Sequence, residues 1–245
     1  MNEIVNLLKS HSSIREYKNQ PVEDEKVKTI IECAQSASTS NSIQSYTIIS
    51  VIDKDNRKNI AYLSGDQSYV EHCPLFLVFC ADLNRNKIAC EISDKTMAEG
   101  YTETFILATV DAALAAQNAL IAAESLGLGG VYIGGIRNNP LEICKILSIP
   151  SGVYPVFGMC LGYPNNNPDK KERLPIEVIF KTDKYNTDGD ANRIKEYDAH
   201  ISDYYKKRTN GKRLDTWTQQ VSTLMSKPQR PHMKDFLDKQ GFKMK

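Results

Sequence analysis

An arginine with hydroxyl and imidazole neighbours lies near the start of this 245-residue chain, in the segment His11-Ser12-Ser13-Ile14-Arg15. A guanidinium keeps its charge at any physiological pH and offers a planar fork of N–H donors, and hydroxyls add further donors and acceptors. This combination binds a phosphate or a polyol. A serine-rich helix connection has the same composition, so the pentapeptide alone leaves a ligand site and a plain turn open.

Other polar groups along the chain have side chains suited to a ligand. Hydroxyls gather in Ser38-Thr39-Ser40-Asn41-Ser42, with Gln44 just beyond, and Gln67 carries an amide that both donates and accepts. Cations occur in Lys171-Glu172-Arg173 and in the basic loop 208–213. Because the formal net charge is only +1, these loops form local positive spots. Each group would also suit a solvated loop.

A glycine-rich run, Gly127-Leu128-Gly129-Gly130-Val131-Tyr132-Ile133-Gly134-Gly135, raises the question of a dinucleotide-binding loop. That loop needs Gly or Ala where this chain has Tyr132, and it follows a strand and precedes a helix, whereas these glycines follow a helix and precede a strand. We therefore reject it. A short strand ending in Gly134-Gly135 remains, where bare backbone approaches a flat ligand or simply turns.

No side chain is paired with a base of its own in a recognisable motif. The sequence lacks a Gly-x-Ser-x-Gly elbow, a His-Glu-x-x-His pair and a phosphate loop. Its six cysteines are scattered without a Cys-x-x-Cys pair, so no metal site is expected. If the protein is an enzyme, a cofactor is expected to supply the chemistry.

The elements that must position these residues mix helices and strands without a β-α-β alternation, which favours an α+β fold. Helical spacing, β-branched runs and caps predict helices over 24–37, 103–126 and from Pro140, strands over 46–53, 75–81, 131–133 and 156–161, and a charged helical tail over 189–245. Helix 103–126 has almost no polar face, which indicates burial in a core or a subunit interface.

Bulk composition excludes several classes of protein. Near-neutral charge argues against a general binder of nucleic acid or membrane surfaces. The alanine-rich run near residue 115 is interrupted by Asp111, Gln117, Asn118 and Glu124, so no membrane span is expected. The first residues lack the pattern of a signal peptide, and the expected location is cytoplasmic.

Taken in order, 11–15, 38–44, Gln67, the run 117–135 and Lys171-x-Arg173-Leu174-Pro175 resemble the oxygen-insensitive NADPH nitroreductases and flavin reductases of the nitroreductase superfamily. The resemblance covers essentially the whole chain. It implies a three-layer α-β-α sandwich with a mixed, mainly antiparallel sheet. It also implies an FMN-binding core, 1–185, and a C-terminal helical extension, 186–245, that embraces the partner subunit of a homodimer.

The resemblance implies that the chemistry occurs at N5 of FMN, with no catalytic side chain. Arg15, Lys171 and Arg173 would bind the flavin phosphate, and residues 38–44 would reach in from the other subunit. The residues implied to contact FMN are His11, Ser12, Ser13, Arg15, Ser38, Thr39, Ser40, Gln44, Gln67, Tyr69, Tyr132, Ile133, Gly134, Gly135, Lys171 and Arg173. Those implied to contact NADPH or the acceptor are Ser42, Arg208, Arg213 and Arg230.

The activity implied is a ping-pong reduction of nitroaromatics, quinones or free flavins by NADPH. Within the enzymes, a dedicated reductase that supplies reduced flavin remains open. A flavin carrier or sensor without turnover is a further alternative, as is a structural domain without a ligand. No nucleic-acid or membrane partner is expected.

Overall fold

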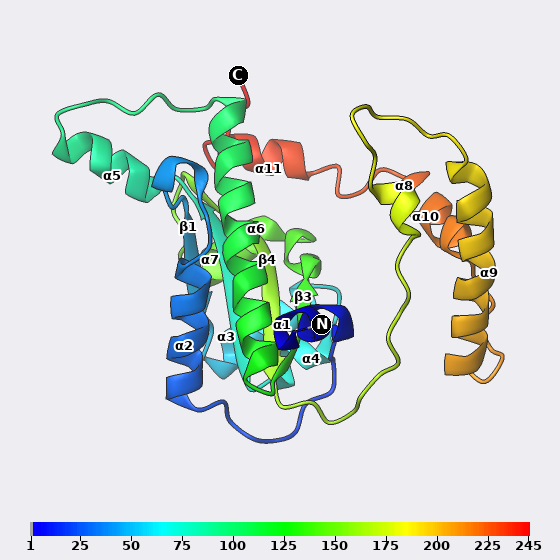
Figure 1. The fold of residues 1–245 in the computed structure, drawn as a ribbon. Coiled ribbons are helices and arrows are strands. Elements are labelled where there is room, and N and C mark those ends of the chain that lie inside the picture. The colour runs from blue at the N-terminus through cyan, green and yellow to red at the C-terminus, as the bar shows by residue number, and fades with distance from the viewer. Residues whose placement is uncertain (1) are drawn as a thin grey trace. The chain divides into compact units, whose positions relative to one another are not determined.

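A computed structural model describes residues 2–245 as two compact units (Figure 1). The first comprises the chain as far as Pro168 together with His232–Lys245, and the second is Asp169–Pro231. The first unit contains a four-stranded sheet and most of the helices, whereas the second is helical.

The sheet has the strand order β1-β2-β4-β3. Its strands are β1 (Tyr46–Ser50), β2 (Leu75–Asp82), β3 (Gly129–Ile133) and β4 (Val153–Gly162). All three pairings are antiparallel, so the sheet within residues 2–245 is antiparallel throughout. The expectation was a mixed, mainly antiparallel sheet. Every residue of β2 is buried, which requires helices on both faces of the sheet. Strand β1 ends earlier than predicted because Asp53 caps the next helix.

Helices supply the two outer layers of the first unit, which confirms the predicted α+β fold. They are α1 (Glu3–Ser10), α2 (Asp24–Gln35), α3 (Lys54–Leu63), α4 (Ser68–His72), α5 (Asn84–Ile92), α6 (Thr102–Ser125), α7 (Pro140–Ile146) and α11 (Met233–Lys239), with the 3-10 turns η1 (Ser40–Ser42) and η2 (Gly134–Arg137). Helix α6 packs against α2 and all four strands, and α3 packs against α4 and α7 (Figure 1).

Helix α6 is the central helix of the first unit. By length and composition it is apolar enough to cross a membrane, contrary to the expectation from the sequence, but most of its alanines pack in the core against the sheet. The buried carboxylate of Asp111 accepts hydrogen bonds from backbone N–H groups. The outer face of α6 is also apolar, because Ile106, Val110 and Leu114 are 47%, 48% and 43% exposed there.

The second unit consists of α8 (Ile176–Ile179), α9 (Asp190–Arg208) and α10 (Trp217–Met225). Helix α10 begins with a capping box in which Thr216 and Gln219 satisfy each other's backbone N–H groups. A small core of Tyr197, Ile201 and Tyr205 joins α9 to the rest of the unit. With α11, these helices confirm the predicted charged helical tail over 189–245.

Candidate functional site

The N-terminal loop 11–17 lies against the edge of the sheet at the start of β3. Ile14 is buried, and its backbone N–H donates to the carbonyl of Gly130 at 3.0 Å. The hydroxyl of Tyr17 donates to the carbonyls of Ile14 (2.7 Å) and Cys160 (3.2 Å). With the loop held at these points, Ser12 and Ser13 are half-buried and Arg15 is exposed.

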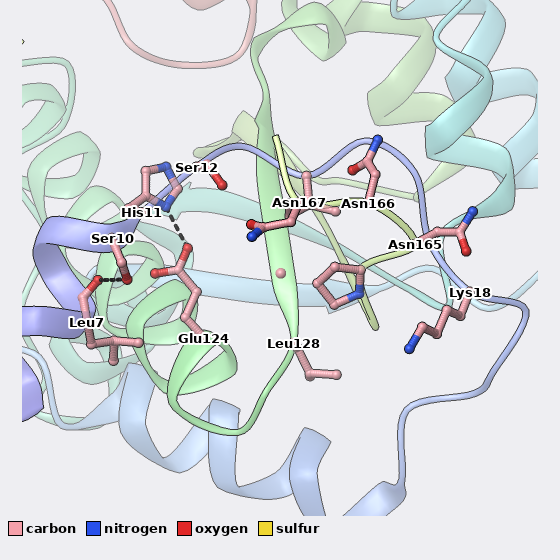
Figure 2. Close-up of a pocket in the computed structure, with 13 residues that line it drawn as sticks. Leu7, Ser10, His11, Ser12, Lys18, Glu124, Leu128, Asn165, Asn166 and Asn167 are labelled. Atoms are coloured by element: carbon pink, nitrogen blue, oxygen red, sulfur yellow. Dashed lines mark hydrogen bonds and ion pairs between the residues drawn. The ribbon is translucent and has the colours of Figure 1, made fainter. Parts of the chain in front are cut away.

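A cleft of about 600 Å³ opens beside this loop. Figure 2 shows His11 and Ser12 on one side of it and Asn165, Asn166 and Lys18 on the other. Nδ1 of His11 lies 2.5 Å from Oε1 of Glu124 on α6, which fixes the imidazole at the rim. The cleft therefore offers imidazole, hydroxyl, amide and ammonium groups, which are the partners of a polar, anionic ligand.

Gln67 lies against Gly135 at the other end of β3. Nε2 of Gln67 donates to the carbonyl of Ser64 at 2.5 Å, and the Tyr69 hydroxyl donates to Oε1 of Gln67. A Cβ at Gly135 would collide with both that Ser64 carbonyl and the Gln67 amide. A Cβ at Gly134 would have only Arg137 nearby, at 3.4 Å, so the backbone there is open on one side. The Ser64 hydroxyl is buried without a hydrogen-bond partner among the described residues.

We expect Gly135→Ala to destabilise the protein by about 1–3 kcal/mol, because the added methyl overlaps a backbone carbonyl that cannot move freely. Urea denaturation measures the change in the free energy of unfolding. Gly134→Ala is the matched control in the same turn, where the nearest atom is 3.4 Å away and the expected change is below about 1 kcal/mol. Equal losses in the two variants would contradict the close packing described for Gly135.

Strand β3 runs between the loop that borders the His11 cleft and the Gly134-Gly135 pair. The Tyr132 hydroxyl donates to Oε1 of Gln117 at 3.2 Å, and its ring packs edge-on against Phe157 at a centroid distance of 5.1 Å. Burial raises the pKa of Tyr132 well above its ordinary value, so the phenol is neutral at physiological pH. Ile133 is fully buried in the core.

The hydroxyl-rich segment 38–44 lies at a different part of α6. The Asp111 carboxylate accepts hydrogen bonds from the backbone N–H groups of Ser40 (3.1 Å) and Ser45 (3.0 Å). Asn41, Ser42 and Gln44 have positive φ, and Ser38, Ser40, Ser42 and Gln44 are exposed. Asp111 precedes Glu124 by thirteen residues, which is about 20 Å along a helix. One protomer therefore does not bring this segment to the cleft beside His11.

The remaining predicted cations all lie in the second unit. Nζ of Lys171 donates to the Tyr205 hydroxyl at 3.0 Å, and the Arg213 guanidinium lies 4.4 Å from the centroid of the same ring. Nη1 of Arg208 donates to the Tyr204 hydroxyl at 2.9 Å. Arg173 is exposed, and Arg230 is half-buried with a φ of 47°. The structure thus places Lys171 and Arg213 around one tyrosine.

Four residues that hold predicted site residues in place, directly or through one another, were not themselves predicted: Asp111, Glu124, Tyr205 and Gln220. Asp111 and Glu124 did leave a signal, since they are polar residues that interrupt an otherwise apolar helix. No comparable feature of the sequence marks Tyr205 and Gln220, because aromatic and amide side chains are common in a charged helical tail. Their contacts depend on how α9 and α10 pack.

Comparison with known proteins gives matches along nearly the whole chain. Residues 8–163 match the model of the nitroreductase family, and residues 171–245 match that of the nitroreductase family C-terminal domain. The chain is 42% identical over 246 residues to an FMN reductase (NADPH) of Bacillus subtilis, covering 99% of each protein. It is 40% identical over 242 residues to an oxygen-insensitive NADPH nitroreductase of Salmonella typhimurium, again covering 99% of each.

The fold is similar to that of solved structures as well. The structure of NfrA1 from B. megaterium superposes with a TM-score of 0.96 at 45% sequence identity, covering 99% of this chain and 100% of that one. The similarity extends through both compact units of the chain.

Proposed function

The chain belongs to the nitroreductase family, and from this premise we propose that it works as a homodimer with FMN bound at the subunit interface. It is an FMN-containing, NADPH-dependent oxidoreductase of the nitroreductase and flavin reductase type. The observation that carries the assignment is that the two family models together take in every residue assigned to the flavin.

The residues present fit FMN. Arg15, Lys171 and Arg173 are cations suited to its phosphate, and the open backbone at Gly134 together with the Gln67 amide suits a flat ring with polar edges. When bound, FMN would supply the redox chemistry: a hydride from NADPH would reduce it, and an acceptor such as a nitroaromatic, a quinone or a free flavin would reoxidise it.

The protein's own part is to bind, orient and stabilise charge. We assign Arg15, Lys171 and Arg173 to the phosphate, and His11, Ser12 and Ser13 to the phosphate, ribityl chain or pyrimidine edge. A backbone N–H of Gly134 or Gly135 would stabilise negative charge near N5, so no acidic side chain is needed there. NADPH and the acceptor would use one pocket in turn, which gives ping-pong kinetics.

Two observations support the homodimer. The apolar stripe Ile106, Val110 and Leu114 on α6 is exposed in one protomer, and such a patch is typical of an interface. Segment 38–44 lies far from the His11 cleft of its own protomer, so it is suited to reach the site of a partner. In this proposal residues 1–185 form the flavin-binding core and 186–245 the extension that covers the partner, and the dimer acts in the cytoplasm.

The test of the function is the response of the purified protein to NADPH without oxygen. We expect a yellow protein whose visible flavin absorbance is bleached by NADPH and restored by a nitroaromatic or a quinone. A colour that NADPH does not change would indicate a carrier or sensor, and a colourless protein that takes up no FMN would contradict the proposal. The ratio of kcat/KM for free FMN and for a nitroaromatic then separates a dedicated flavin reductase from a nitroreductase.

We assign Arg208, Arg213 and Arg230 to the 2′-phosphate of NADPH and to anionic acceptor groups, and Ser42 to the acceptor pocket. Arg208→Ala or Arg213→Ala is expected to raise KM for NADPH about tenfold, with a much smaller effect on NADH, because charge-assisted hydrogen bonds of about 1.5 kcal/mol are lost. Arg193→Ala, which removes a guanidinium bound to the Asp188 carbonyl, is the control. Equal effects on NADPH and NADH would contradict the assignment.

A further inference from the structure

Tyr205 occupies a central place in the second unit. It is a buried residue of α9 and shares a small core with Tyr197 and Ile201. Two cations from different segments, Lys171 and Arg213, meet at its side chain. The function proposed above assigns Lys171 to the FMN phosphate and Arg213 to the NADPH 2′-phosphate. Tyr205 therefore supports one residue for the binding of FMN and another for the binding of NADPH.

The hydroxyl of Tyr205 holds Lys171. Nζ of Lys171 donates to this oxygen at 3.0 Å, and the hydroxyl in turn donates to Oε1 of Gln220 on α10 at 3.1 Å. Gln220 therefore orients the hydroxyl with a lone pair toward the ammonium. One of the three ammonium donors is used in this way, and two remain for an anion.

The ring of Tyr205 holds Arg213. The guanidinium carbon lies 4.4 Å from the ring centroid, which is within the range of a cation–π contact. Nε and Nη2 of the same guanidinium bind the Asp215 carboxylate at 2.8 Å and 2.7 Å, which fixes the plane of the group. Its Nη1 donors remain on the other side for an anion.

The electrostatics of Tyr205 agree with this arrangement. Burial acts to raise its pKa, but the hydrogen bond from Lys171 and the charges of Lys171 and Arg213 lower the pKa below its ordinary value. The hydrogen bond with Gln220 also lowers the pKa, so the polar contacts of the phenol together outweigh the effect of its burial.

We propose that Tyr205 is a positioning residue that sets Lys171 through its hydroxyl and Arg213 through its ring, and thereby governs FMN affinity and the preference for NADPH over NADH separately. This inference rests on the proposed function, in which Lys171 binds the FMN phosphate and Arg213 the NADPH 2′-phosphate. The Lys171 ammonium also lies 5.1 Å from the ring centroid, but only the hydroxyl accepts its hydrogen bond. Substitutions that remove the hydroxyl alone, or the hydroxyl and the ring together, therefore divide the two effects.

In Tyr205→Phe the ring stays and the hydroxyl is lost. We expect the dissociation constant of FMN to rise about three- to tenfold, while the ratio of KM for NADH to KM for NADPH stays within about twofold of the original. In Tyr205→Leu both contacts are lost, so FMN binds at least as weakly as in Tyr205→Phe and KM for NADPH also rises about three- to tenfold, with KM for NADH unchanged.

The dissociation constant is measured from the flavin fluorescence that appears when the purified holoenzyme is diluted, a readout independent of turnover. Ile201→Val is the matched control, because it loosens the same small core without touching either cation. The inference is overturned if both Tyr205 variants behave like Ile201→Val, or if Tyr205→Phe alters FMN affinity and the cofactor preference together.

Two further variants separate this inference from the function on which it rests. Lys171→Ala must weaken FMN binding and Arg213→Ala must raise KM for NADPH. If either has no effect, the assigned phosphate contact is wrong and the role of Tyr205 fails with it. If both have the expected effect and the Tyr205 variants have none, the positioning role alone is wrong.

Discussion

Arg15→Ala is expected to weaken FMN binding about ten- to a hundredfold, so that the protein is purified with little flavin. Arg15 lies in the loop 11–17, between the backbone hydrogen bond of Ile14 to Gly130 and the hydroxyl hydrogen bonds of Tyr17, and its side chain is exposed. A charge-assisted hydrogen bond contributes about 1.5–3 kcal/mol, and each 1.4 kcal/mol is a factor of ten in affinity.

The measurement is the dissociation constant of FMN together with that of riboflavin, which lacks the phosphate. If Arg15 binds the phosphate, the substitution weakens the binding of FMN and leaves the affinity for riboflavin nearly unchanged. Lys28→Ala is the control for the loss of one positive charge, because Lys28 is an exposed residue of α2 outside the predicted site. Full flavin occupancy in Arg15→Ala would show that the phosphate is held elsewhere.

Val110→Glu is expected to convert the proposed homodimer to monomers and to remove FMN from the proposed sites at its interface. Val110 lies in the middle of the exposed apolar stripe of α6, between Ile106 and Leu114. In a twofold dimer each substitution occurs twice, and burying an unpaired carboxylate costs several kcal/mol. We therefore expect the dimer dissociation constant to rise at least about a hundredfold.

Light scattering after size-exclusion chromatography, at several protein concentrations, measures the mass in solution, and the visible spectrum gives the FMN content. Ile52→Glu is the matched control, since Ile52 is an apolar residue that is 82% exposed and lies outside the α6 stripe. A dimeric, fully yellow Val110→Glu protein would exclude this face of α6 as the interface.

The secondary structure could largely be predicted from the sequence because its signals are local. Apolar spacing and caps placed α2, α6 and β2 within a few residues of their bounds, and the glycines after α6 marked the start of β3. The order of the motifs sufficed for the family, which the family models confirm. Strand direction could not be read in this way, since a mixed and an antiparallel sheet share the same strand patterns.

The sequence by itself therefore determined the elements, the family and the types of side chain that could hold a flavin. Only the tertiary structure decided which of them meet. Glu124 fixes His11 across 113 residues, Asp111 holds Ser40 across 71, and Lys171 meets Tyr205 across 34. These contacts depend on how the helices pack against the sheet and against one another, and no local spacing of residues encodes that packing.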